Sequence, residues 1–303
     1  MRFYSMTPER SHAYRVSIHG HSIESDGQMD VDAIVEEAGS LGLDFIGLTD
    51  HETMLGARRL PAAVASYNER HPYNLLVAVP GIELRVNDFG RHTDMLVALP
   101  FTDDKRHADF IHWTRWASLH ADKLSAESLA KDAVAYHDAM VVIPHPDLPL
   151  AGSMSFSRMR GFCLKAPDWV RSHVGIEVWN HSQQLVLPLN PLRPFFLSRA
   201  IRDLPVARFY FTDFHSRRML AAGGSKFFGT ERSSGELMRA VSERRIEPMY
   251  SNPDGSLRDW FHLFITYARQ WQPYGKIKGR NHLRMQAFQD PIPVERRKTP
   301  GPR

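Results

Sequence analysis

The sequence contains little cysteine and no long hydrophobic run. Cys163 is the one cysteine among 303 residues, which excludes an internal disulfide and a zinc site made of several cysteines. We expect Cys163 to be a buried structural residue, and the scarcity of thiols favours a reducing, cytoplasmic location. The longest apolar runs, 75–80 and 95–100, fall far short of the roughly 20 residues of a membrane helix. The first ten residues lack the apolar segment of a secretory signal, so we expect neither export nor membrane insertion.

The net charge of +4 is unevenly distributed. Residues 276–303 contain eight basic and two acidic side chains, so this segment carries +6 and residues 1–275 carry −2. The segment is also rich in proline, which is typical of solvated chain ends, and a basic arm can bind the phosphates of a nucleic acid. We therefore divide the chain into a catalytic domain, residues 12–250, and a C-terminal extension, residues 251–303, that contains this basic tail.

Short strand patterns alternate with amphipathic helical patterns along the domain. Strands are predicted at 14–22, 45–49, 75–86, 93–99, 140–143, 175–179 and 207–212, and helices at 31–41, 54–68, 104–122, 125–137, 191–201 and 234–243. The turn residues 87–90 predict a hairpin, whereas the glycine-rich stretch 223–226 is expected to be a flexible loop. The alternation predicts an α/β fold with a mostly parallel sheet, open or closed into a barrel.

Histidine is abundant, with sixteen residues, and many of these stand beside acidic residues where predicted strands end. Five segments share this feature, and they contain His19, His21 and Asp26; Asp50 and His51; Glu83, His92 and Asp94; His145; and Asp213 and His215. Residues i and i+2 of a strand face the same side, so His19 and His21 can offer two imidazoles to one metal ion. The ends of parallel strands are also where α/β folds place their active sites.

A histidine after a strand is usually a surface or hydrogen-bonded residue, so each segment alone is weak evidence. Five such strand ends in one α/β chain nevertheless predict a metal site. Imidazoles and carboxylates without thiolates suit borderline or hard cations such as Zn²⁺, Mn²⁺ or Fe²⁺.

Taken in order along the chain, these segments resemble the PHP (polymerase and histidinol phosphatase) family of metal-dependent phosphoesterases. The resemblance covers about residues 14–216 and rests on the pattern HxHSxxSDG, TDH, PGxE, HP, EV and SDFH, with Thr212 in place of the usual serine of the last motif. The sequence looks most similar to the branch that acts on nucleotide 3′,5′-bisphosphates and on short RNA ends. The resemblance implies a distorted, TIM-like (β/α)7 barrel with two or three divalent metals at the C-terminal ends of its strands.

The resemblance also implies ligand sets for the metals. It implies a first metal held by His19, His21, Glu83 and Asp213, a second held by Glu83, His92 and His145, and a third held by Asp26, His51 and His215. Of these ligands, Asp26, Glu83, Asp213 and His215 are the implied catalytic residues. Asp94 competes with His92 for the second metal. The 40 residues between Leu99 and Met140 are too few for the helical insertion of the bisphosphate-specific relatives, which leaves the substrate open.

The expected reaction is hydrolysis of a phosphoester by a metal-bound hydroxide at a di- or trinuclear site. The substrate would be a phosphomonoester or a nucleotide or oligonucleotide phosphate. Guanidinium groups bind phosphate oxygens as a bidentate fork, and the candidates near the site are Arg158, Arg160, Arg217 and Arg218, with His181 as a further substrate contact. Glu177 is expected to orient a neighbouring ligand rather than to bind metal.

Three alternatives remain open at this point. The same site could hydrolyse carboxyl or carbamate esters. A nuclease could use the basic tail to hold the backbone of a nucleic acid. A binding or regulatory subunit with a metal-free PHP fold is disfavoured, because every ligand position retains a competent side chain.

Overall fold

The computed structural model describes residues 11–88, 90–100, 103–146, 152–180, 197, 200–221 and 223–249. His181, nearly all of the helix predicted at 191–201 and the C-terminal extension lie outside the described residues. The division between a catalytic domain and a C-terminal extension therefore stays a prediction.

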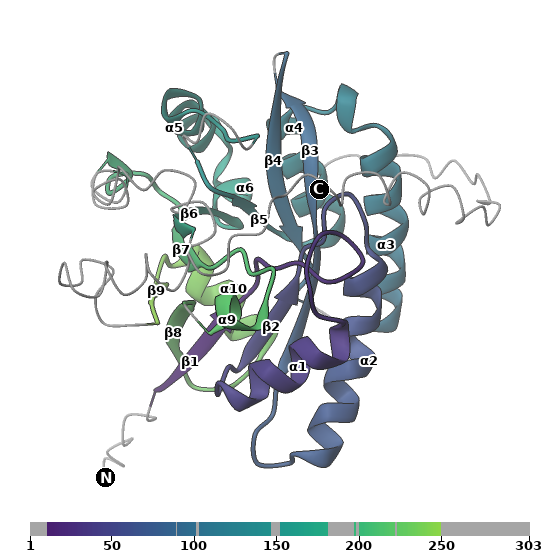
Figure 1. Cartoon of the computed structure of the whole chain (residues 1–303). Coiled ribbons are helices and arrows are strands. Elements are labelled where there is room, and N and C mark those ends of the chain that lie inside the picture. Colours follow the sequence, from purple (N-terminus) through teal and green to yellow (C-terminus); the bar gives the residue numbers. More distant parts are fainter. Residues whose placement is uncertain are drawn as a thin grey trace, which may run out of the picture. The chain divides into compact units, whose positions relative to one another are not determined.

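The described chain forms one mixed sheet with helices between its strands (Figure 1). Its strands are β1 (His12–Ser17), β2 (Phe45–Leu48), β3 (Val77–Asp88), β4 (Arg91–Ala98), β5 (Met140–Ile143), β6 (Val174–Asn180), β7 (Ala207–Phe211), β8 (Ser225–Gly229) and β9 (Glu247–Pro248). The helices are α1 (Val31–Ser40), α2 (Leu55–Arg70), α3 (Asp104–Leu119), the 3-10 turn η1 (Ala121–Lys123), α4 (Ala126–His137), α5 (Phe156–Lys165), α6 (Asp168–Arg171), α9 (Arg217–Leu220) and α10 (Ser234–Ser242).

The strands follow the order β7-β6-β5-β4-β3-β2-β1-β8-β9, and the sheet curves into a nearly closed, barrel-like form. The sheet approaches closure where the backbone N–H of Tyr210 on β7, one end strand, donates to Ser225 Oγ on β8, the neighbour of the other end strand, at 2.9 Å. Among the described residues, four of the eight strand pairings are parallel and four are antiparallel. The expectation of a mostly parallel sheet was therefore wrong, whereas the α/β barrel-like fold is confirmed.

Two features of the chain produce the antiparallel pairings. The predicted hairpin is present: β3 pairs antiparallel with β4, Gly90 adopts the left-handed backbone that the turn requires (φ 79°), and its N–H donates to Asn87 Oδ1. The stretch expected to be a loop instead leads into β8, which pairs antiparallel with β1. Its alternation of buried Ser225, Phe227 and Gly229 with more exposed residues is the period-2 signal of a strand.

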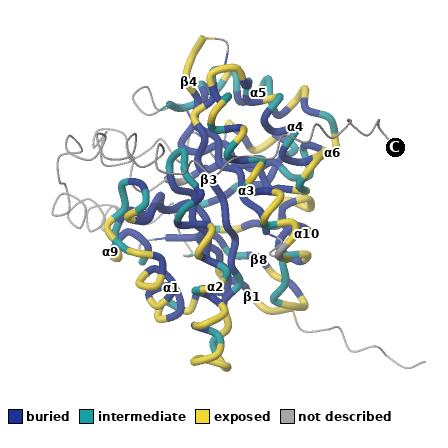
Figure 2. Tube along the Cα trace, turned by 90° about the vertical axis from the view of Figure 1, so that its right-hand side faces the viewer, coloured by how far each residue is buried: buried dark blue, intermediate teal, exposed yellow. Residues whose placement is uncertain are grey.

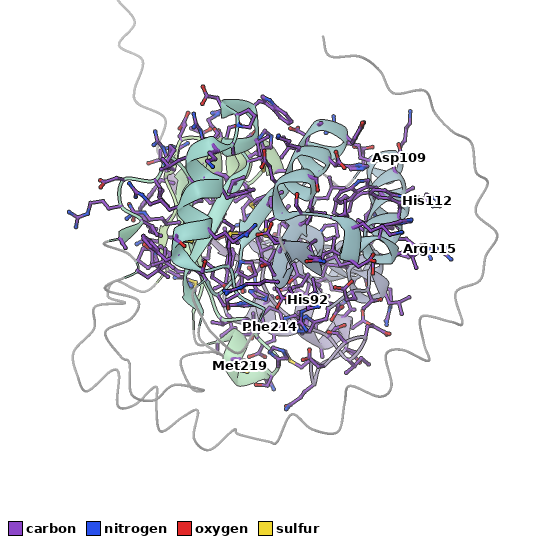
Figure 3. All side chains as sticks on the ribbon, turned by 90° about the horizontal axis from the view of Figure 1, so that it is seen from above. His92, Asp109, His112, Arg115, Phe214 and Met219 are labelled. Carbon is purple, nitrogen blue, oxygen red and sulfur yellow. The ribbon has the colours of Figure 1, made fainter. Side chains whose placement is uncertain are left out.

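Alternate residues of the strands pack into two apolar clusters, one on each face of the sheet. On one face Ile46, Val97 and Val141 pack with the buried sides of the surrounding helices, and on the other Phe45, Leu96 and Val142 pack in a cluster that includes residues of α10. Most of the strand residues are accordingly buried in Figure 2, while the tip of β4 and the outer faces of α1 and α2 are exposed. The exposed outer side of α3 carries Asp109, His112 and Arg115, which point away from the sheet in Figure 3.

Helix starts follow local sequence signals. Asp30 caps α1 by accepting a hydrogen bond from Ala33 N at 2.8 Å, and Ser125 forms a capping box with Ser128 at the start of α4. Cys163 is buried in α5, as predicted, and burial raises the pKa of its thiol to about 12. No helix within the described ranges is both long enough and apolar enough to span a bilayer.

Candidate metal centre

The candidate ligands lie together at one edge of the sheet. They come from β3 and from the segments that follow β1, β2, β5 and β7: His19, His21, His51, Glu83, His145, Asp213 and His215. The strands β1, β2 and β3 are parallel, as are β5, β6 and β7. Because β4 runs antiparallel to both β3 and β5, all six of these strands point the same way and their carboxyl ends meet.

Side chains from these strand ends form three groups that could each hold a cation. The Asp213 group contains His19, His21 and Asp213; the Asp26 group contains His21, Asp26, His51 and His215; and the Asp94 group contains Glu83, Asp94 and His145. Within each group, one ligand atom from every residue lies within 4.8 Å of the others. His21 belongs to two groups, so the first two sites are contiguous.

Glu83 links the groups through its two carboxylate oxygens. Its Oε2 lies 3.3 Å from His19 Nε2, 3.4 Å from His21 Nε2 and 3.2 Å from His51 Nδ1, and its Oε1 lies 3.1 Å from His145 Nε2. The side chain is 1% exposed. A carboxylate that presents one oxygen to each side is suited to bridge two cations.

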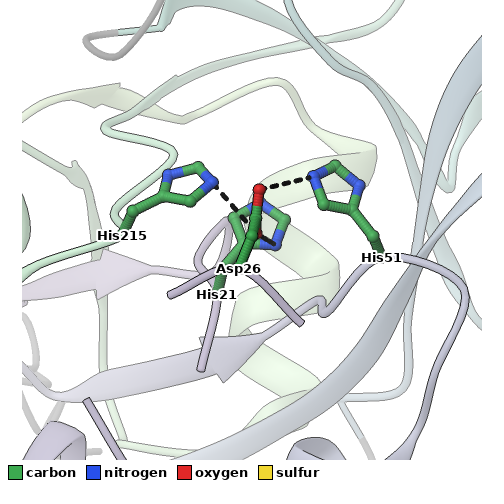
Figure 4. Close-up of side chains that lie close together, drawn as sticks. All are labelled: His21, Asp26, His51 and His215. Atoms are coloured by element: carbon green, nitrogen blue, oxygen red, sulfur yellow. Dashed lines mark ion pairs between the residues drawn. The ribbon is translucent and has the colours of Figure 1, made fainter. Parts of the chain in front are cut away.

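The Asp26 group is the most accessible part of the cluster. Asp26 lies between two imidazoles, with Oδ1 3.2 Å from His215 Nε2 and Oδ2 3.7 Å from His51 Nε2 (Figure 4). The rings of His51 and His215 both stack on His21, with centroids 4.4 Å apart. His51 is 36% exposed whereas His21 is fully buried, so solvent reaches the cluster on the side of His51.

The structure does not bring His92 into the cluster. His92 is exposed near the turn of the hairpin, opposite Asn87, whereas Asp94, two residues further along β4, is buried beside Glu83 and His145. Both residues point to the same face, because they are two apart on a strand. Of these two alternatives, the structure places Asp94 and not His92 in the cluster, so Asp94 is the candidate ligand and the prediction of His92 is corrected.

Neighbouring polar groups hold the imidazoles in orientation. Glu177, on β6, accepts from His19 Nδ1 at 2.9 Å and from the backbone N–H of His145 at 2.7 Å. The Nδ1 of His215 donates to the backbone carbonyl of Asp213, at 2.8 Å. In His19 and His215 the Nε2 atom is thereby left to face the carboxylates, which is the arrangement that metal-binding histidines use.

Gly20 shows why the two histidines of the first motif are separated by glycine. A Cβ at this position would lie 2.0 Å from the ring of Phe214, which is buried between the two site residues of the last motif. The backbone N–H of His21 also donates to the carbonyl of Phe214 at 2.8 Å. Because Gly20 has no side chain, the segment that contains His19 and His21 can pack directly against the segment that contains Asp213 and His215.

Two of the candidate ligands have strained backbones. Asp213 (φ 51°) and His145 (φ 32°) both lie at positive φ, a region that residues other than glycine seldom occupy. Such strain is maintained only where surrounding contacts over-determine the conformation, and it gathers at functional sites.

The charges of the cluster are strongly coupled. Burial alone would raise the pKa of Asp213, but the imidazoles of His19 and His215 hold it well below its usual range. Burial alone would lower the pKa of His215, but Asp213 and Asp26 outweigh this effect and raise it to about 9. The pKa of His21 is lowered, by burial first and then by His51 and His215. Asp213 and His215 thus favour each other's charged forms, whereas His21 is favoured in its neutral form.

Metal loading should consequently depend on pH. A metal must displace the proton of His215, so we expect affinity to rise about tenfold per pH unit for each displaced proton as the pH approaches 9. A competition titration of the metal-free protein at pH 6, 7 and 8 measures this dependence. An affinity that stays flat across this range would contradict the assignment of His215 as a ligand.

Glu177→Gln tests the orienting contacts. Glutamine retains one acceptor oxygen, so it cannot accept from both His19 and His145, and we expect a 10- to 100-fold loss of metal affinity. Glu127→Gln, which alters an exposed carboxylate on α4, is the matched control. If Glu177 had only a structural role, the variant would lose thermal stability while its metal affinity stayed at the wild-type value.

The arginines named as substrate contacts have other partners. Arg158 pairs with the buried carboxylate of Asp88, and Arg217 pairs with Glu37 on α1. Arg160 is exposed on α5. Both ion pairs use the Nε atom of the guanidinium, so a substrate role for Arg158 or Arg217 stays a prediction.

Sequence reasoning named Asp50 among the strand-end residues without giving it a role, and it missed Arg85. Asp50 is fully buried and accepts from the backbone N–H and hydroxyl of Ser22 and from the hydroxyl of Ser25, which fixes the loop that carries Asp26. Arg85 pairs with Asp94. The signal for Arg85 was its i, i+2 relation to Glu83, which places both side chains on one face of a strand.

Comparison with solved structures bears directly on the fold. Over 84% of this chain and 70% of the other, it superimposes on a two-domain protein from Bacteroides vulgatus that contains a predicted PHP-like metal-dependent phosphoesterase, with a TM-score of 0.52 and 16% identity. The chain has a PHP-like fold. PsfC from Pseudomonas syringae shares this fold at a TM-score of 0.52 and 15% identity, over 86% of this chain and all of that protein. No family model and no curated protein matches the sequence.

The residues of this PHP-like fold fit divalent cations. The buried Nε2 atom of His21 lacks a hydrogen bond of ordinary geometry although it lies 2.9 Å from Asp213 Oδ1 and 3.4 Å from Glu83 Oε2. A cation would satisfy this nitrogen and the converging carboxylates together. The donor set contains only imidazole and carboxylate groups, which suits Zn²⁺, Mn²⁺ or Fe²⁺.

Proposed function

We propose that this protein is a metal-dependent hydrolase of phosphoesters. The observation that carries the proposal is the largely buried cluster of five imidazoles and several carboxylates at the strand ends of a PHP-like fold: His19, His21, His51, His145 and His215 with Asp26, Glu83, Asp94 and Asp213. The description of the Bacteroides vulgatus protein as a predicted phosphoesterase supports the same reaction class.

In this proposal, the residues of the three groups would hold divalent cations, and Glu83, whose two oxygens face different imidazoles, would supply ligand oxygens. When bound, such metals activate water as a nucleophile and stabilise charge on the attacking and leaving oxygens of a displacement at phosphorus. Glu177 and the backbone carbonyl of Asp213 keep two imidazoles turned so that their Nε2 atoms face the centre. His51 and Asp26 form the accessible side through which a substrate approaches.

The charge of the cluster favours an anionic substrate. Asp26, Glu83 and Asp213 supply three negative charges, and the charge of Asp94 is matched by Arg85. With the buried carboxylates of Glu177 and Asp50 the negative charges total five, so three divalent cations, one for each group, would exceed them and leave the site positive. A phosphate dianion gains from such a site, whereas a neutral carboxyl ester does not.

A hydrolysis screen tests the proposal. The full-length protein, loaded with Mn²⁺ or Zn²⁺, is assayed with p-nitrophenyl phosphate, bis-p-nitrophenyl phosphate, nucleotides and short oligonucleotides, alongside p-nitrophenyl acetate. We expect phosphoester turnover that a chelator removes and that Asp213→Asn abolishes, with Glu127→Gln as the unaffected control. Turnover of the acetate alone would replace the proposal with a carboxyl-ester hydrolase. No turnover of any ester by the loaded protein would overturn the enzymatic function.

A further inference from the structure

Arg85 brings a permanent cation to the Asp94 group. It lies two residues after Glu83 on β3 and directly opposite Asp94 on β4. Its Nε donates to Asp94 Oδ1 at 2.6 Å and its Nη2 donates to Oδ2 at 3.0 Å. Both oxygens of the carboxylate therefore accept from one guanidinium, in the bidentate geometry that gives strong charge-assisted hydrogen bonds.

Asp94 is locked in this position. Its side chain is 3% exposed and its backbone N–H donates to the carbonyl of Gly152 at 2.6 Å. Gly152 packs so closely that a Cβ there would lie 2.3 Å from Asp94 Oδ2. The Arg85 side chain, in contrast, is 43% exposed and can turn into solvent. If the pair opens, the guanidinium is the partner that moves.

The Asp26 group is built differently. Among the described residues, Asp26 forms ion pairs with the imidazoles of His21, His51 and His215. An imidazole can give up its proton and then coordinate the metal that takes the place of that proton, whereas a guanidinium stays charged and has no lone pair to offer. A metal entering the Asp94 group must therefore share Asp94 with a fixed positive charge or displace that charge.

We propose that Arg85 controls the metal occupancy of the Asp94 group. Its guanidinium competes with a metal for Asp94, so this group binds its ion at least tenfold more weakly than the Asp213 and Asp26 groups. The cluster then holds two ions firmly and a third that exchanges. This inference rests on the proposed function only in that both require metals at the cluster.

The test is a metal-retention curve for the full-length protein. Wild type and variants are loaded with Mn²⁺ at one pH, dialysed against decreasing free Mn²⁺ and analysed for metal per chain. For wild type we expect one metal equivalent to dissociate at a free Mn²⁺ concentration at least tenfold higher than the concentration at which the other equivalents dissociate. Arg85→Gln removes the competing guanidinium and should lower the free Mn²⁺ concentration of that step at least tenfold. Arg91→Gln removes the same charge from the exposed start of β4 and should leave the curve unchanged.

Two results would overturn the inference. One is a wild-type curve in which all equivalents leave in a single step, and the other is an Arg85→Gln curve that superimposes on that of wild type. Arg85→Lys provides a second variant if glutamine prevents folding. Lysine keeps the positive charge without the bidentate guanidinium geometry, so the free Mn²⁺ concentration of this step should fall to a value between those of wild type and Arg85→Gln. Absence of any bound metal would refute the proposed function as well, whereas two firm equivalents with no response to Arg85 would refute this inference alone.

Discussion

Glu83→Gln is expected to lower phosphoester turnover by at least about a thousandfold, which corresponds to roughly 4 kcal/mol of transition-state stabilisation. Glu83 contacts the imidazoles of four histidines through its two oxygens and is almost completely buried. Glutamine has nearly the same shape but lacks the negative charge and replaces one oxygen with a donor. A cation bridged by Glu83 would therefore lose a ligand, so we also expect the loss of at least one metal equivalent. Steady-state kinetics and elemental analysis of the same preparation measure both effects.

Glu127→Gln is the matched control for Glu83→Gln. Glu127 pairs with Lys131 on the exposed side of α4, and its replacement should leave turnover and metal content unchanged. The secondary structure of Glu83→Gln, followed by circular dichroism, should match that of wild type. A Glu83→Gln variant with wild-type turnover would show that this carboxylate holds no catalytic metal.

Removal of metal should lower the melting temperature by on the order of 10 °C. A ligand present at 1,000 times its Kd stabilises the native state by about 4 kcal/mol, and 1 kcal/mol corresponds to roughly 2–4 °C for a domain of this size. The physical reason is that the native cluster gathers carboxylates and imidazoles in buried positions that cations would neutralise. Thermal unfolding with Mn²⁺ and with a chelator measures the difference.

Asp213→Asn separates this effect from non-specific action of the chelator. The variant lacks one of the carboxylates that converge on His19 and His21, so its melting temperature should respond much less to added Mn²⁺ or to chelation. Equal melting temperatures of the wild-type protein with and without metal would argue that the cluster is a hydrogen-bonded network rather than a metal centre.

The sequence predicted those features that depend on local periodicity. Alternating strand patterns located the strand ends, and the i, i+2 spacing of His19 and His21 placed both imidazoles in one cluster. The same rule could not separate His92 from Asp94, because both face the same side of β4. Only the register of the hairpin shows that His92 lies near the turn and Asp94 beside Glu83.

Features that depend on distant partners left no local signal. The carboxylates that pair with Arg158 and Arg217 lie 70 and 180 residues away in the chain. Likewise, β8 pairs with β1 across more than 200 residues, and its short glycine-flanked sequence resembles a loop when considered alone. These contacts form only when distant segments come together in the fold, so single segments do not reveal them.

The central claim, that the histidine and carboxylate cluster is a metal centre, is tested most directly by elemental analysis of the full-length protein after loading with Mn²⁺ or Zn²⁺ and dialysis. The account predicts about two firmly held metal ions per chain, reduced to about one by Asp213→Asn, which removes a ligand of one group only. Less than one ion per wild-type chain after loading would contradict the account.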